Sequence, residues 1–129
     1  MKKIIFTGFM LFCLVATTIG AESEGGSRSL PTPGMVTMVD LGADKCIHCK
    51  MMAPILEELG KEYEGLATVA FIDVWKNPDQ AKRFGVRAIP TQIFYDRDGK
   101  EVERHVGYLD KKSILEIFSK LGVATETEK

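Results

Sequence analysis

The sequence has few cysteines and no excess of charge of one sign. Its 129 residues include three cysteines, one tryptophan and two histidines, with 17 basic against 18 acidic side chains. A chain without a basic stripe offers no electrostatic surface for phosphates, which excludes nucleic acid as its main partner. There is no internal repeat. The length, with 45% hydrophobic and 27% charged residues, predicts one globular domain plus some additional sequence.

The additional sequence lies at the N-terminus. Lys2 and Lys3 precede an uncharged apolar run over 4–19, and Ala21 ends a small-residue exit, a pattern typical of a secretory signal peptide. An uncleaved membrane anchor is the alternative, although the run is shorter than the ~20 residues that span a bilayer. We expect cleavage after residue 21 and a periplasmic or otherwise extracytoplasmic location. The mature chain then keeps 15 basic and 18 acidic residues and two cysteines, in a compartment that permits disulfides.

Hydrophobic patterns predict the organisation of the remaining chain. Residues 22–34 are rich in Gly, Ser and Pro and are expected to form a flexible linker. A domain over 35–122 and a disordered tail over 123–129 follow. The expected elements are strands at 35–43 and 66–74, helices at 47–63, 77–85 and 110–121, and a hairpin over 91–107 that turns at Asp98-Gly99. The order β-α-β-α-β-β-α predicts an α/β fold in which helices cover both faces of a mixed sheet of about four strands.

The segment "KCIHCKMMAPILEEL", residues 45–59, places Cys46 and Cys49 at the start of the first helix. Haem attachment is excluded because Lys50, and not histidine, follows the second cysteine. A static disulfide across so few residues would stabilise little. Copper(I) binding, with His48 and Met51 or Met52 as further soft ligands, stays open as an alternative, but no metal site is expected since there is no second cysteine pair. The pattern favours redox chemistry, with Cys46 as the nucleophile at the helix N-terminus and Cys49 as the resolving thiol one turn later.

Several motifs in the same order resemble the thioredoxin family. "VDLGADKCIHCKMMAPILEEL" is similar to the family's strand, active site and helix, with Pro54 at the expected kink, and "FGVRAIPT" is similar to the segment that carries its cis-proline. The resemblance covers about residues 35–122. It departs at Lys45, where the family has tryptophan, and at Ile47-His48, where it has Gly-Pro. The family's first strand and helix are not recognised.

The resemblance implies roles for further residues. Asp40, six positions before Cys46, corresponds to a buried acid that relays a proton to and from Cys49; the alternative is an acid at the exposed end of a strand. Pro90 is expected to follow a cis bond. The residues expected to bind substrate are Ile89, Thr91 and Gly107.

The sequence also suggests roles for three further side chains. His48 and Lys45 are expected to stabilise the Cys46 thiolate by donating a hydrogen bond and adding positive charge. A stabler thiolate implies a more oxidising couple. Trp75 is expected to serve packing rather than function.

The sequence therefore predicts an exported thiol–disulfide oxidoreductase. It needs no bound cofactor because electrons move through the Cys46–Cys49 pair itself. Its expected partners are protein disulfides and an electron donor in the membrane or an extracytoplasmic compartment, and it is expected to be a monomer. Reduction is the favoured direction. A disulfide-forming oxidase of the same fold and a copper-binding module are the two alternatives.

Overall fold

A computed structural model describes residues 29–125 of the chain. The predicted element order is confirmed, with each boundary within a few residues of the expected one. The elements are β1 (Val36–Gly42), α1 (Ile47–Glu62), β2 (Ala67–Asp73), α2 (Pro78–Arg83), β3 (Thr91–Tyr95), β4 (Glu101–Val106) and α3 (Lys111–Lys120). No helix within 29–125 is long and apolar enough to cross a membrane. The expected signal peptide over 1–21 lies outside the described residues.

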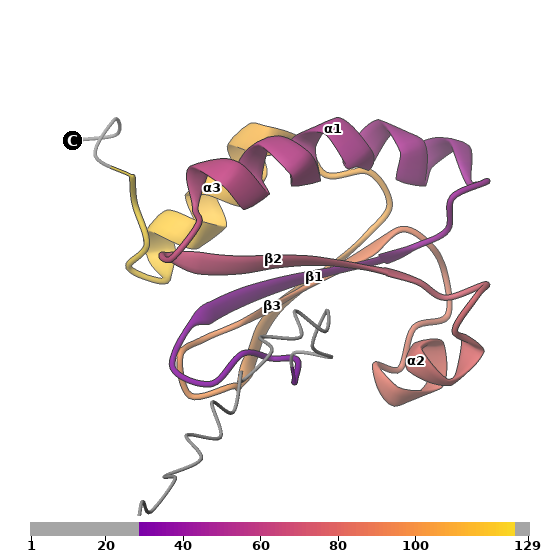
Figure 1. Cartoon of the computed structure of the whole chain (residues 1–129), viewed down its shortest axis with the longest axis horizontal. Coiled ribbons are helices and arrows are strands. Elements are labelled where there is room, and N and C mark those ends of the chain that lie inside the picture. Colours follow the sequence, from indigo (N-terminus) through magenta and orange to yellow (C-terminus); the bar gives the residue numbers. More distant parts are fainter. Residues whose placement is uncertain (1–28, 126–129) are drawn as a thin grey trace, which may run out of the picture.

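The four strands form one mixed sheet in the order β2-β1-β3-β4. β1 pairs in parallel with β2 and antiparallel with β3, and β4 pairs antiparallel with β3. Helices α1 and α3 cover one face of the sheet, and α2 lies on the opposite side (Figure 1). All seven residues of β1 are buried, as expected for a central strand with both faces covered. This confirms the predicted layered architecture.

The core has one part on each face of β1. Val36 and Met38 pack with α1 and α3 around Phe118, whereas Val39 and Leu41 pack on the other side with residues near α2. Successive side chains of a strand point to opposite faces, so the apolar run of β1 supplies both parts. The run ends at the C-terminal end of β1, and α1 begins a few residues later. The cysteine pair at the start of α1 therefore lies at this end of the central strand.

The packed unit extends beyond the expected domain limits. Leu30 contacts the core part on the α2 side, and its carbonyl accepts a hydrogen bond from Arg83 at 2.8 Å. The Thr32 amide donates to Thr37 Oγ1 at 3.0 Å. Val123 is buried with α1 and α3. The packed unit therefore begins at about Leu30 rather than at residue 35, because these contacts depend on distant residues that a local composition does not reveal.

Two details of α1 and α2 are visible only in the structure. Asn77 precedes α2 but makes no capping bond to it; its side-chain amide instead donates to the Asp73 carbonyl at 3.1 Å. Ile47 and Met51 are exposed. The face that packs on the sheet consists of Cys49, Met52, Leu56 and Leu59, and at 3.6 residues per turn Ile47 and Met51 lie on the other side of the helix.

Candidate active site

The two cysteines occupy different environments at the N-terminus of α1. Cys46 is the N-cap residue, with an extended backbone, and its Sγ accepts a hydrogen bond from the Cys49 amide at 3.4 Å. Cys49 lies inside the first turn and is only 4% exposed. Both thiols are free. The half-buried sulfur at the cap faces the unpaired amides of the helix start, which favour a thiolate, whereas the second sulfur is sheltered from solvent.

Burial sets the protonation of the second cysteine. Desolvation is the largest cause that raises the pKa of Cys49 to about 12, with smaller contributions in the same direction from the neighbouring Cys46 thiol and from Asp40. Gly42 allows this close packing: a Cβ at this glycine would lie 3.1 Å from the Cys49 Sγ and 3.0 Å from the Phe71 ring. Cys49 is thus a thiol that stays protonated until a base removes its proton.

A buried carboxyl lies beneath the pair. Asp40 is 0% exposed, so it is not an acid at an exposed strand end. Its Oδ1 accepts a hydrogen bond from the Gln92 side chain at 2.7 Å, while Asp40 Oδ2 and Gln92 Oε1 have no partner among the described residues. Burial raises the pKa of Asp40 to about 6, against the smaller lowering by the Gln92 hydrogen bond. A carboxyl with a pKa near the working pH can both accept and return a proton.

Sequence reasoning missed Gln92. It stands opposite Asp40 in the antiparallel pairing of β1 with β3, and directly opposed residues share one face of a sheet. The signal was present in the sequence, since Gln92 is an amide in the otherwise apolar run "QIFY", the same kind of anomaly that singled out Asp40. Only the strand register shows that these two buried polar side chains are hydrogen-bonded to each other.

The structure brings Pro90 and Gly107 together. The Ile89–Pro90 peptide bond is cis, and the Gly107 amide donates to the Pro90 carbonyl at 2.8 Å. Gly107 has φ +105° and open space where a side chain would lie. The Thr91 side chain is buried and donates to the Ala88 carbonyl at 2.7 Å, so any contact of Thr91 with a substrate would involve its backbone. Ile89 is half-buried against the core near α2.

The other predicted residues lie at the surface or in the core. His48 and Lys45 are exposed, and among the described residues neither donates a hydrogen bond to Cys46. Met52, named as a possible copper ligand, is fully buried, and its sulfur accepts a hydrogen bond from the Leu109 amide at 3.4 Å. Within residues 29–125, no three histidine, cysteine or acidic side chains are grouped to hold a metal ion.

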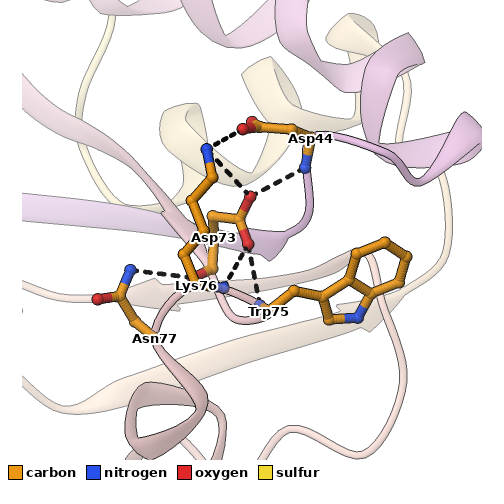
Figure 2. Close-up of polar contacts among 5 residues, drawn as sticks. All are labelled: Asp44, Asp73, Trp75, Lys76 and Asn77. Atoms are coloured by element: carbon orange, nitrogen blue, oxygen red, sulfur yellow. Dashed lines mark hydrogen bonds and ion pairs between the residues drawn. The ribbon is translucent and has the colours of Figure 1, made fainter.

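A second polar cluster borders the active-site segment, and sequence analysis did not anticipate it. The Asp73 carboxylate accepts hydrogen bonds from the Asp44, Trp75 and Lys76 amides at 2.9–3.0 Å (Figure 2). These amides, led by that of Asp44, lower the pKa of Asp73. Lys76 also pairs with the Asp44 carboxylate. Trp75, which was expected to serve packing, is 62% exposed, and its indole is directed away from the Asp73 carboxylate and its partners (Figure 2).

Comparisons with known proteins agree with this geometry. The family profile for thioredoxin matches residues 29–120. Thioredoxins of Staphylococcus saprophyticus and Staphylococcus aureus are each 42% identical over 85 residues, which cover 66% of this chain and 81% of theirs. The structure of Fasciola hepatica thioredoxin superimposes with a TM-score of 0.60 at 34% identity, covering 68% of this chain and 82% of that one.

A thioredoxin structure from Nicotiana alata gives a similar result, with a TM-score of 0.59 at 36% identity, covering 67% of this chain and 73% of that one. Family profile, sequence relatives and solved structures therefore agree on one assignment, and they agree with the free Cys-X-X-Cys pair at the start of α1. The chain belongs to the thioredoxin family and is a thiol–disulfide oxidoreductase.

Proposed function

We propose that this protein is an exported reductase of disulfide bonds in extracytoplasmic proteins. The observation that carries the proposal is the arrangement of two free thiols of unequal exposure at the start of α1, above a buried carboxyl. The half-exposed Cys46 is available to an incoming disulfide, whereas Cys49 and Asp40 are sheltered beneath it. This asymmetry assigns the two cysteines different roles in one exchange cycle.

In the first step, the Cys46 thiolate attacks one sulfur of the substrate disulfide. A bond forms between Cys46 and that sulfur, the bond between the two substrate sulfurs breaks, and the released thiolate takes a proton from solvent. The substrate is now held through a mixed disulfide to Cys46. The helix start stabilises the attacking thiolate, because its unpaired amides carry partial positive charge.

In the second step, Asp40 accepts the proton of Cys49, and the resulting thiolate attacks the Cys46 sulfur. The mixed disulfide breaks and the second substrate thiol leaves with a proton. Overall, two cysteine thiols become the Cys46–Cys49 disulfide and the substrate disulfide becomes two thiols, a transfer of two electrons and two protons. An extracytoplasmic or membrane dithiol must then return the protein to its reduced state.

The exported location is supported by the pattern of residues 1–21, in which a short charged start precedes an apolar run and a small-residue exit. We expect the mature protein recovered from its host to begin at Glu22, in the extracytoplasmic fraction. N-terminal sequencing after cell fractionation measures both properties. Recovery of the whole chain with the membranes would support the uncleaved anchor instead, and recovery from the cytoplasm would contradict export.

The reducing direction is supported by the relatives, which are named thioredoxins, and by the solvent-accessible positions of His48 and Lys45, where water and salt weaken their influence on Cys46. We expect a reduction potential below about −200 mV, nearer the ~−270 mV of thioredoxin than the ~−120 mV of a strong oxidant. Equilibration with glutathione buffers, followed by thiol alkylation and mass measurement, gives this value.

The variant His48→Pro tests how much the residues beside Cys46 change the reduction potential. Loss of the imidazole beside Cys46 should make the couple more reducing by ~10–30 mV. Lys45→Trp should change it less, because a flexible exposed ammonium is well screened. A wild-type potential above about −180 mV would favour the disulfide-forming oxidase over the reductase.

A further inference from the structure

Trp75 is the one tryptophan of the chain, and it is held at the surface. Its side chain is 62% exposed, an unusual position for the largest apolar side chain. Its backbone, in contrast, is fixed, because the Trp75 amide donates to Asp73 Oδ1 at 2.9 Å. Figure 2 shows the indole directed away from the Asp73 carboxylate and its partners. The turn therefore presents an aromatic side chain to solvent on a rigid support.

The same carboxylate connects this turn to the active-site segment. Asp73 Oδ2 accepts a hydrogen bond from the Asp44 amide at 3.0 Å, and Lys76 pairs with the Asp44 side chain. Two residues later the chain reaches Cys46, whose amide donates to the Ala43 carbonyl at 3.1 Å. The position of Trp75 is thus coupled through Asp73 to the segment that ends at the nucleophile.

Trp75 and the residue before Cys46 line one surface cavity. This cavity, of about 260 Å³, is bordered by Trp75, Lys45, Asp44, Asp73 and Lys76. Its acidic groups are already engaged: Asp44 with Lys76, and Asp73 with Lys76 and three backbone amides. The four charged side chains sum to zero, so the cavity offers no net charge to a partner. Its distinctive recognition element is the indole.

We propose that Trp75 is a specificity-determining residue that contacts an apolar side chain close to the reacting cysteine of a polypeptide substrate. This inference rests on the proposed function, since the substrate is the polypeptide held on Cys46. The cavity adjoins Lys45, so a substrate joined to Cys46 extends over it within one or two residues of its cysteine. An aromatic or branched aliphatic side chain there can pack on the indole and remove both surfaces from water.

The test compares two peptide disulfides that differ at one position. Phenylalanine or serine is placed in turn at each of the two positions before and after the cysteine, and kcat/KM for reduction is measured for each pair. We expect the wild type to prefer the phenylalanine peptide by about three- to tenfold at one or more positions, the range of an aromatic contact. Trp75→Ala should bring this ratio close to one, and Trp75→Phe should restore most of it.

Leu66→Ala is the matched control. Leu66 is also an exposed apolar residue, at 46%, but it precedes β2 at the end of the sheet opposite Cys46. Its removal should leave the preference unchanged. Reduction of hydroxyethyl disulfide, which has no neighbouring side chain, reports the exchange chemistry separately. A wild type unable to reduce it would contradict the proposed function, whereas a working wild type without preference, or a Trp75→Ala protein that keeps the preference, would overturn only the role of Trp75.

A second measurement does not depend on turnover. Because Trp75 is the only tryptophan, the fluorescence of a mixed disulfide between the Cys49→Ser protein and each peptide reports its surroundings directly. We expect a blue shift and reduced quenching by iodide with the phenylalanine peptide, and little change with the serine peptide. Equal spectra for both mixed disulfides at every position would contradict contact between Trp75 and the substrate.

Discussion

Replacing Cys46 with serine should abolish disulfide exchange, and replacing Cys49 with serine should trap the substrate on the protein as a mixed disulfide. The serine hydroxyl of the Cys46→Ser protein is not ionised near neutral pH and cannot displace a disulfide sulfur. The Cys49→Ser protein keeps the half-exposed thiol at the start of α1, so it still attacks. It lacks the sheltered thiol that completes the exchange, so the intermediate accumulates.

Non-reducing gels and intact mass measurement distinguish the two variants after mixing with a disulfide peptide. The expected product of Cys49→Ser has the mass of the protein plus one peptide and is released by dithiothreitol. The double variant serves as the control for nonspecific capture. Trapping by Cys46→Ser in place of Cys49→Ser would reverse the two roles. A mixed disulfide on neither variant would show that the pair does not form this intermediate.

Replacing Asp40 with asparagine should slow the second step of exchange by ~10²-fold near neutral pH, a typical loss when a general base is removed. The side chain is buried beneath a thiol whose pKa lies at about 12, and an amide cannot take the proton of that thiol. In the wild type the rate should rise with pH through about 6, as Asp40 loses its proton. The Asp40→Asn protein should lack this rise.

The same substitution should stabilise the folded protein above about pH 6. Burial raises the Asp40 pKa from 3.8 to about 6, so between these values the folded state binds more protons than the unfolded state. Stability therefore falls as pH rises through this interval and stays reduced above it. Asparagine removes this cost, which is at most about 3 kcal/mol, while it can still accept the Gln92 hydrogen bond. Below about pH 4 the gain should vanish.

Urea unfolding at pH 4 and pH 7.5, with stopped-flow release of the peptide thiol, measures both effects. Gln92→Met is the matched control, since it keeps the shape of the side chain but removes the 2.7 Å bond to Asp40. That bond lowers the Asp40 pKa, so its loss should move the rise in rate to higher pH and leave the general base in place. An Asp40→Asn protein that loses stability at neutral pH while its rate is unchanged would give the acid a structural role alone.

The order of the elements follows from the sequence alone, because strands and helices impose different periods on apolar residues. Short continuous apolar runs located β1 and β2, helical spacing of apolar residues located α1, and the Asp98-Gly99 pair located the hairpin between β3 and β4. The sequence also located the cysteine pair at the start of α1, since the spacing of Cys46 and Cys49 and the apolar positions that follow are local properties of the chain.

Tertiary structure alone decided which of these residues meet. The strand register places Gln92 opposite Asp40, and no local pattern connects residues 52 positions apart. The sequence suggested a packing role for Trp75, but Asp73 accepts hydrogen bonds from both the Trp75 and the Asp44 amides, and the indole is exposed to solvent. Hydrophobicity indicates that a side chain prefers burial. Whether the fold buries it depends on contacts between distant segments, which exist only once the chain has folded.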